Sequence, residues 1–129
     1  MLWVAELAPI GLIGQLFVQL ESHRTELADG RTRAYIYSFR VRSDYRGAGI
    51  GTLLMQSAET DLEKRGYHSI TLNVGRDNPG ARRLYERFGY TVVADEPGSW
   101  SYLDHNGHRR HVHEPSWRME KELVQAPTR

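Results

Sequence analysis

A glycine-rich turn near the middle of this 129-residue sequence is its densest chemical signal. The turn consists of seven residues: Arg46, Gly47, Ala48, Gly49, Ile50, Gly51 and Thr52. Alternating glycines tolerate positive φ and let the backbone approach a ligand closely. A helix that begins at such a turn presents free N–H groups and the positive end of its dipole. A phosphate or pyrophosphate is therefore the expected occupant, and Arg46 adds a fork of donors for it.

The glycine spacing differs from two common phosphate-binding motifs. A P-loop ends in Gly-Lys-Ser/Thr, whereas Thr52 follows Gly51 directly. A dinucleotide-binding fingerprint reads Gly-x-Gly-x-x-Gly, whereas the glycines here alternate. A tight strand-to-helix turn without a ligand stays open as an alternative, because glycines alone are a weak motif.

A second segment with a recognisable pattern opens with Asn78 and Pro79. Asparagine is a favoured helix N-cap, and proline is favoured at the first helical position. The predicted helix ends at Gly89, and one of its faces is apolar: Ala81, Leu84, Tyr85 and Phe88. From spacing alone, such an aromatic and aliphatic stripe is typical of core packing.

Hydrophobic periodicity predicts the elements that hold these two segments. Strands are expected at 2–7, 12–21, 34–42, 69–74, 90–94 and 117–124. A helix is expected at 50–65, with Gly66 as its left-handed C-cap. Asn106-Gly107 predicts a hairpin between 100–105 and 108–113. This order of strands and helices predicts one α/β domain over 1–129, with a mixed sheet.

Composition excludes several classes of protein. Hydrophobic residues make up 40% and charged residues 26%, as in folded globular domains. Because cysteine is absent, neither a disulfide framework nor a zinc–thiolate site is expected. The net charge of +1 gives no general attraction to nucleic acid, and no apolar run is long enough for a membrane helix. No signal peptide is recognisable, so the cytoplasm is the expected compartment.

The two segments together resemble the GCN5-related N-acetyltransferase (GNAT) family. Arg46, Gly49 and Gly51 fill its acetyl-CoA motif, Arg/Gln-x-x-Gly-x-Gly/Ala. Residues 78–90 resemble its Asn-x-x-Ala-x-x-Leu-Tyr-x-x-x-Gly-Phe/Tyr helix, and 119–123 resemble its last strand. The resemblance covers about the whole chain from 2 to 123. It implies a mostly antiparallel sheet with a central parallel strand pair, flanked by helices.

The resemblance also implies how acetyl-CoA would bind as co-substrate. The pyrophosphate would lie on the backbone N–H groups of Gly47, Ala48, Gly49, Ile50, Gly51 and Thr52. The pantetheine arm would pair with Phe39 and Val41 between two splayed strands, 35–42 and 69–74. An N–H group near Phe39–Arg40 would stabilise the oxyanion. Asn78 would contact the cofactor, and no metal is expected.

Tyr85 would also contact the cofactor, as the general acid that protonates the departing CoA thiolate. A phenol of pKa near 10 protonates a thiol of pKa near 8.5 only with help from its environment. The implied activity is transfer of acetyl to a primary amine of a small molecule or peptide, by direct attack on the thioester. Two alternatives stay open: a non-catalytic acyl-CoA-binding or regulatory module, and a metal-binding interaction protein built on four hairpin histidines, His105, His108, His111 and His113.

The general base and the acceptor pocket are less defined. Many relatives carry a glutamate on the strand before the glycine turn, and 35–42 contains no carboxylate. The base candidates are Glu6, Glu21, His23, Asp77 and the hairpin histidines, with a water chain to solvent as the alternative. The acceptor-pocket candidates are Trp100, Tyr102 and Trp117, which are equally suited to cross-strand packing or a dimer surface.

The N-terminal part departs from the family pattern. The family usually has a strand and two helices before the segment equivalent to 2–21, and here only Met1 precedes it. These three elements, which shape much of the acceptor pocket, are therefore expected to be missing from this sequence. A sheet face left uncovered would favour a homodimer.

Overall fold

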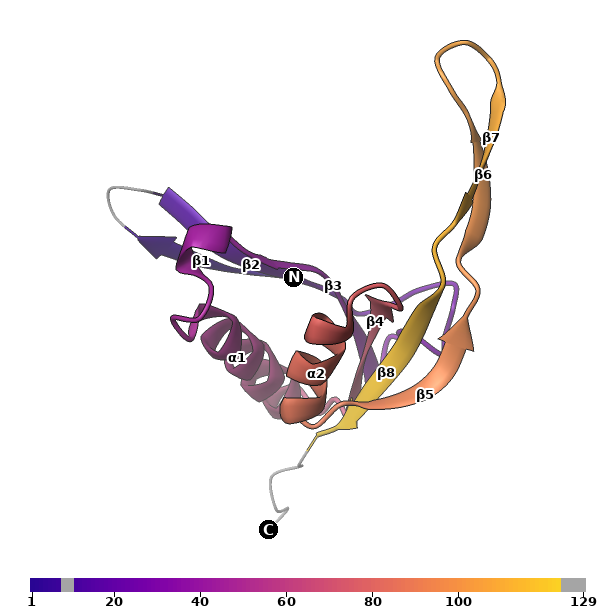
Figure 1. The fold of residues 1–129 in the computed structure, drawn as a ribbon. Coiled ribbons are helices and arrows are strands. Elements are labelled where there is room, and N and C mark those ends of the chain that lie inside the picture. The colour runs from indigo at the N-terminus through magenta and orange to yellow at the C-terminus, as the bar shows by residue number, and fades with distance from the viewer. Residues whose placement is uncertain (8–10, 124–129) are drawn as a thin grey trace. The chain divides into compact units, whose positions relative to one another are not determined.

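The computed structural model describes residues 1–7 and 11–123 (Figure 1). The chain forms two compact units. Unit 1 contains Met1–Leu72 together with the residues from Glu122 onward, and unit 2 contains Asn73–Lys121.

Unit 1 is a sheet with one long helix. Its strands are β1 (Leu2–Leu7), β2 (Gly11–Gln19), β3 (Arg33–Val41) and the first part of β4 (Ser69–Gly75). Strands β1, β2 and β3 pair antiparallel, whereas β3 and β4 pair parallel from Arg33↔Ser69 to Ile36↔Leu72. A 3-10 turn (η1, Ser43–Tyr45) and helix α1 (Ile50–Lys64) connect β3 to β4.

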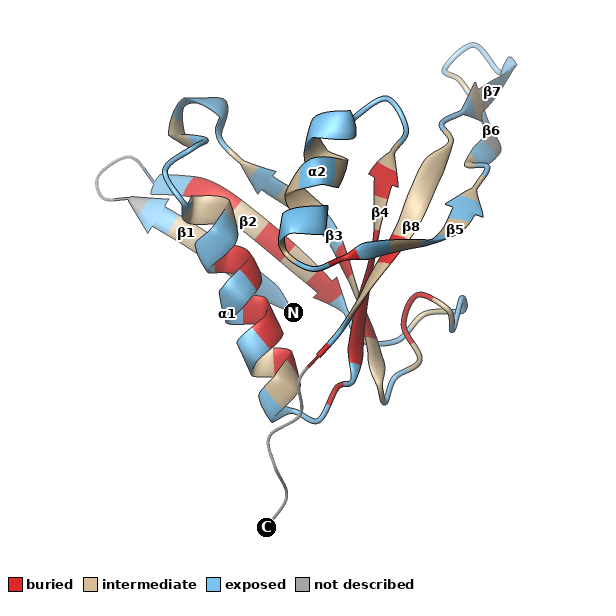
Figure 2. Ribbon diagram, turned by 60° about the horizontal axis from the view of Figure 1, so that its bottom comes forward, coloured by how far each residue is buried: buried red, intermediate tan, exposed pale blue. Residues whose placement is uncertain are grey.

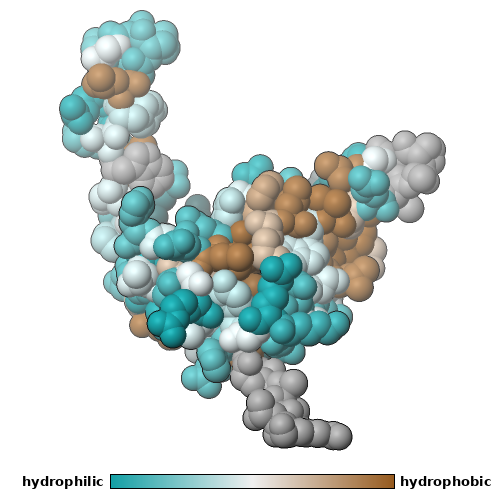
Figure 3. All heavy atoms as spheres, turned by 180° about the vertical axis from the view of Figure 1, so that it is seen from behind, coloured by the Kyte–Doolittle hydropathy of each residue, from teal (hydrophilic) through white to brown (hydrophobic). Residues whose placement is uncertain are grey.

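Helix α1 packs its apolar face on β1, β2 and β3. The buried residues of the helix are Leu54, Met55, Ala58, Glu59 and Leu62, and the burial pattern is visible in Figure 2. Leu16 and Val18 of β2 are buried, whereas Phe17 between them points to the opposite side of the sheet. That opposite side exposes Leu2, which pairs with Phe17. Hydrophobic side chains gather over β1 and β2 in Figure 3.

Unit 2 contains the end of β4, helix α2 (Pro79–Arg87) and four further strands. The strands are β5 (Thr91–Glu96), β6 (Ser99–Leu103), β7 (Arg109–His113) and β8 (Ser116–Glu122), whose last residue belongs to unit 1. Strand β5 pairs antiparallel with β8, and β6 pairs antiparallel with β7 as a separate two-stranded sheet. Val74, Tyr90 and Met119 are buried in this unit.

The predicted fold class is confirmed. The structure has a mixed, mostly antiparallel sheet, with one parallel strand pair and two helices. The left-handed end of the first helix is also observed, with Gly66 at φ 87°. The last strand ends at Glu122, and Val124, the predicted end, lies outside the described residues.

The hairpin loop is longer than predicted. Asn106-Gly107 indicated strands that continue to 105 and begin again at 108, but β6 ends at Leu103 and β7 begins at Arg109. The Asp104 carboxylate accepts hydrogen bonds from the backbone N–H groups of Asn106 and His108, both at 2.9 Å. This side-chain capping stabilises a five-residue loop, 104–108, which the backbone hydrogen bond from Asp104 N–H to the His108 carbonyl oxygen closes at 2.9 Å.

No helix in the described part of the chain is long and apolar enough to span a membrane.

Two leucines of α1 provide a test of this packing. Leu62 is fully buried, whereas Leu53 is 63% exposed. We expect Leu62→Ala to lower the free energy of unfolding by about 2–5 kcal/mol, because it leaves a cavity under the helix. We expect Leu53→Ala, in the same helix, to change it by less than about 1 kcal/mol. Urea unfolding followed by circular dichroism measures both, and equal losses would contradict the packing described here.

Candidate active site

The glycine turn joins the end of β3 to the start of α1. Gly47 and Gly49 both have φ of 82°, in the left-handed region that favours glycine. A Cβ atom at either position would find open space, so these two glycines are required by the backbone conformation and not by crowding. Arg46 supports the turn through its Nε, which donates to the carbonyl oxygen of Val41 at 3.2 Å.

Gly51 lies close to the side chains at the end of β3. A Cβ atom there would lie 3.3 Å from Cζ of Phe39 and 3.7 Å from Cγ2 of Val41. The first turn of α1 therefore lies directly against the end of β3. The structure thus brings together three residues that the sequence predicted for the cofactor site.

The N-terminus of α1 is suited to an anion. Its N-cap is Gly49, no side chain accepts a hydrogen bond as a cap there, and the first turn has no acidic residue. The first N–H groups of an α-helix have no partner within the helix and carry the positive end of its dipole. A ligand phosphate placed here would meet backbone donors without a competing side-chain carboxylate in that turn.

Strand β3 contains a bulge where the predicted pantetheine strand pair should open. Gln15 of β2 pairs with Arg40 and Phe17 pairs with Tyr37, so β3 has one extra residue between them. Ser38, inside the bulge, has φ of 49° and is the one non-glycine residue with positive φ in the described chain. The parallel register with β4 runs only to Ile36↔Leu72. Phe39 and Val41 thus lie beyond the paired part of the two strands.

Unit 2 carries the other predicted site residues. Asn78 is the N-cap of α2, and its Oδ1 accepts a hydrogen bond from the N–H of Ala81 at 3.1 Å. Tyr85 lies in the last turns of α2, with its ring edge against Tyr90 at 6.2 Å between centroids. Burial raises the pKa of the Tyr85 phenol above its usual value. The phenol is therefore protonated at neutral pH, which is the form that a proton donor requires.

Unit 2 also contains a cluster of aromatic and cationic residues that was only partly anticipated from the sequence. Trp117 of β8 was a pocket candidate, and the guanidinium groups of Arg76 and Arg82 lie 4.2 Å and 5.4 Å from its ring centroid. Arg76 also forms an ion pair with Asp95, which stands opposite Trp117 in the β5–β8 register. Nothing in the sequence pattern pointed to the two arginines, since their spacing to Trp117 is long and irregular.

The predicted base candidates are all on the surface. Glu6, Glu21, His23 and Asp77 are exposed, as are the four hairpin histidines. Of the other acceptor candidates, Tyr102 is 50% exposed on the hairpin, and the side chain of Trp100 lies outside what the structure describes. The base and the acceptor pocket stay predictions.

Comparison with known proteins places these features in a family. The sequence profile of the Acetyltransferase (GNAT) family matches residues 2–90. A probable N-acetyltransferase san of Drosophila melanogaster is 33% identical over 89 residues, which are 68% of this chain and 48% of that protein. N-alpha-acetyltransferase 30 of Schizosaccharomyces pombe is 35% identical over 79 residues, which are 60% of this chain and 49% of that protein. The chain thus spans about half the length of these curated relatives.

Solved structures show the same fold. Ard1 from Thermoplasma volcanium superposes with a TM-score of 0.72 at 23% identity, covering 95% of this chain and 70% of that one. Chaetomium thermophilum Naa20, solved with a bisubstrate analogue, gives 0.72 at 26% identity, covering 93% and 64%. The NatC complex bound to Gag peptide and CoA gives 0.72 at 23% identity, covering 95% and 71%. The glycine turn, the family profile and the fold agree: this chain belongs to the GNAT acetyltransferase family.

Proposed function

We propose that residues 1–129 form one acetyltransferase domain, which transfers acetyl from acetyl-CoA to a primary amine of a small molecule or peptide. The observation that carries this proposal is the glycine turn at the start of α1. Its left-handed glycines leave open space around the backbone, and its helix N-terminus has no capping side chain. These features fit a pyrophosphate, and family membership supports acetyl-CoA as its source.

The turn would bind the pyrophosphate through the N–H groups of 47–52, and Arg46 would hold the turn on β3. The bulge supports an extended ligand arm beside Phe39 and Val41, because β3 and β4 are paired only as far as Ile36↔Leu72. Asn78 would contact the same arm while it caps α2.

The reaction requires two proton transfers. Acetyl-CoA supplies an activated thioester, whose carbonyl carbon the amine nitrogen attacks while the carbon–sulfur bond breaks. Tyr85 would donate its phenolic proton to the thiolate sulfur, and its raised pKa keeps that proton available at neutral pH. The ammonium proton of the acceptor would leave through one of the base candidates or a water chain, and a proton from solvent would restore the phenol.

We propose a primary amine as the acceptor, on either a small molecule or a peptide. Relatives include N-alpha-acetyltransferases, and a structural neighbour is a nourseothricin acetyltransferase. These names support both a peptide and a small-molecule acceptor.

We also propose a cytoplasmic protein that needs neither nucleic acid nor membrane. A homodimer would cover the exposed side chains of Leu2, Val4 and Tyr37.

A non-catalytic acyl-CoA-binding module is the second candidate, because β3 (Arg33–Val41) carries no carboxylate that could act as base. The two candidates share the glycine turn and differ in whether Tyr85 has a chemical role. Turnover therefore separates them, whereas CoA binding does not.

Substitution of Tyr85 tests the general-acid role. We expect Tyr85→Phe to lower kcat by about 100-fold, because general acid catalysis is lost, while CoA affinity changes little. Tyr67→Phe, another largely buried tyrosine, serves as the control and should keep the parent kcat. The assay is release of free thiol from acetyl-CoA with a panel of primary amines. Unchanged turnover in Tyr85→Phe would refute the role, and CoA binding without turnover on any amine would favour the binding module.

Substitution of Gly49 tests the turn. An alanine at φ 82° costs about 1–2 kcal/mol in backbone strain, so Gly49→Ala should distort the turn and weaken CoA binding by about tenfold or more. Gly107→Ala is a matched control, since Gly107 has φ of 77°, also has open space around its Cβ position, and lies in the hairpin loop. Isothermal titration with CoA should show the loss only for Gly49→Ala. Equal affinities in the two variants would place the CoA phosphates elsewhere.

A further inference from the structure

Unit 2 places two guanidinium groups on one indole ring. Arg76, directly after β4, lies 4.2 Å from the ring centroid of Trp117 on β8, and Arg82 of α2 lies 5.4 Å from it. Both distances fall within the roughly 6 Å over which an aromatic face attracts a cation. These three residues, here named the Trp117 cluster, are accessible to a ligand. Trp117 is half-buried, and the side chains of Arg76 and Arg82 are 36% and 39% exposed.

The two arginines differ in how firmly acidic neighbours hold them. Arg76 forms an ion pair with Asp95, whereas Nε of Arg82 lies 3.5 Å from Oε1 of Glu86. A charge-assisted hydrogen bond between such groups is usually about 2.7–2.9 Å long, so Glu86 holds Arg82 loosely. An arginine that meets an aromatic face also keeps the N–H donors at its edge, in a fork that matches a carboxylate. Arg82 is therefore suited to bind the carboxylate of a ligand.

The position of Arg82 on α2 relates the cluster to the proposed chemistry. Arg82 and Tyr85 are three residues apart, so they lie on the same face of the helix, separated by about one turn, or roughly 5 Å along its axis. In the proposed reaction, Tyr85 would protonate the CoA sulfur, and the amine attacks the carbon bonded to that sulfur. A group a few bonds from the amine would then lie within reach of the Arg82 guanidinium.

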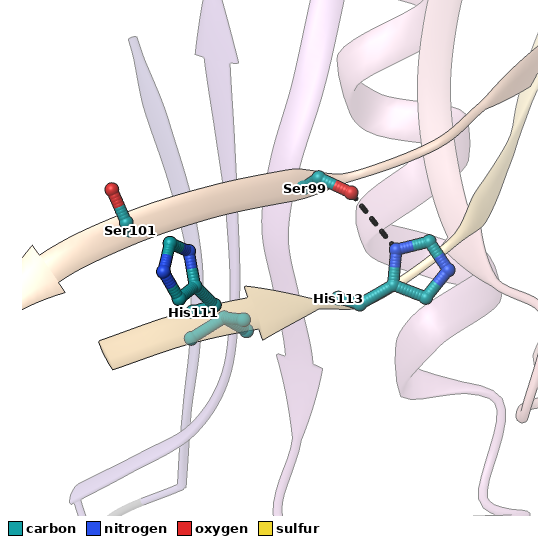
Figure 4. A pocket seen from close by; sticks show the side chains of 5 residues that line it. Ser99, Ser101, His111 and His113 are labelled. Carbon is teal, nitrogen blue, oxygen red and sulfur yellow. Dashed lines mark hydrogen bonds between the residues drawn. The ribbon is translucent and has the colours of Figure 1, made fainter. Parts of the chain in front are cut away.

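The imidazoles of the hairpin, in contrast, do not converge in this way. Ser99, Ser101, His111, Val112 and His113 line the pocket drawn in Figure 4. Nδ1 of His113 is 2.9 Å from Oγ of Ser99, and the rest of the His113 ring is turned away from His111 (Figure 4). These two rings offer no common site for one ligand group, whereas Arg76 and Arg82 share one indole.

We propose that Arg82 is a specificity-determining residue of the acetyl transfer, which binds a carboxylate that the acceptor carries a few bonds from its primary amine. This inference rests on the proposed function and narrows its acceptor to small amino acids or to peptides with an acidic residue near the N-terminus. Trp117 is the positioning residue, because its ring holds the guanidinium, and Arg76 adds a second positive charge. Exposed ion pairs contribute little to stability, so the carboxylate of the acceptor can replace Glu86.

Two pairs of matched acceptors test the proposal. They are β-alanine against β-alaninamide, and the amidated peptide Ser-Glu-Gly against amidated Ser-Gln-Gly. The members of each pair share a primary amine and differ in one carboxylate. We expect kcat/KM to be at least about tenfold higher for the acid than for the amide in one pair, mainly through a lower KM. The pair that shows this preference distinguishes a small-molecule acceptor from a peptide.

Variants of the cluster identify the group that reads the carboxylate. Arg82→Gln should bring the acid-to-amide ratio close to one while KM for the amide changes little. Trp117→Leu should lower the ratio, and Trp117→Phe, which keeps an aromatic ring, should retain most of it. Arg83→Gln is the matched control, because it removes an exposed cation from the same helix and should leave the ratio unchanged. Both acceptors are measured on the same variant, so the ratio does not depend on the fraction of folded protein.

Isothermal titration of the CoA-bound chain with the same four acceptors gives a readout that needs no turnover. Tighter binding of an acid than of its amide, lost in Arg82→Gln, would support the carboxylate site even if no amine is acetylated, and only the proposed function would then fail. Equal values for acid and amide in both pairs would overturn the carboxylate site and leave acetyl transfer intact. A preference that Arg83→Gln abolishes as fully as Arg82→Gln would also overturn it.

Discussion

The left-handed turn at Gly47 and Gly49 is the constraint on which the entry of the chain into α1 depends. Helix α1 must bury Leu54, Ala58 and Leu62 against the sheet, which fixes its axis and its rotation. The chain leaves β3 at Val41 and enters that helix at Ile50, by way of η1 and the glycine turn. Two residues at φ 82° accomplish the reversal, and they leave the first N–H groups of α1 without a side-chain cap. The same left-handed turn thus allows α1 to pack on the sheet and leaves the N-terminus of the helix uncapped.

The bulge in β3 lies on a strand that pairs with β2 on one side and with β4 on the other. Gln15 donates through Nε2 to the carbonyl oxygen of Ser38 at 3.3 Å, which holds the extra residue on the β2 side. Positive φ at a serine costs free energy, and the antiparallel pairs on both sides of the bulge compensate for it. On the β4 side the regular register stops before the bulge. Ser38, the strained residue, therefore lies just beyond the point where the regular pairing of β3 with β4 ends.

Local patterns predicted most of the fold, because the decisive residues are close in sequence. Asn78 and Pro79 predicted the start of α2, and Gly66 predicted the left-handed end of α1. The bulge at Ser38 escaped prediction because serine has no preference that favours it, and its cause is the pairing with β2. The length of the hairpin loop escaped for a similar reason: the Asp104 carboxylate competes with the turn preference of Asn106-Gly107. The candidate site residues could be named because their motifs are local in sequence, and their roles stay predictions, whereas the arginines on Trp117 depend on long-range contacts.

Those arginines restrict how α2 can lie on its own part of the sheet. Arg82 and Tyr85 are three residues apart, so they share one face of the helix. Contact of Arg82 with the Trp117 ring on β8 limits rotation of α2 about its axis, and the edge contact of Tyr85 with Tyr90 limits it from the other end. Arg76 approaches the same indole from the end of β4, with Asp95 as its ion-pair partner. The Arg82–Trp117 contact and the Tyr85–Tyr90 edge contact therefore both limit how α2 can rotate, and burial raises the pKa of the Tyr85 phenol.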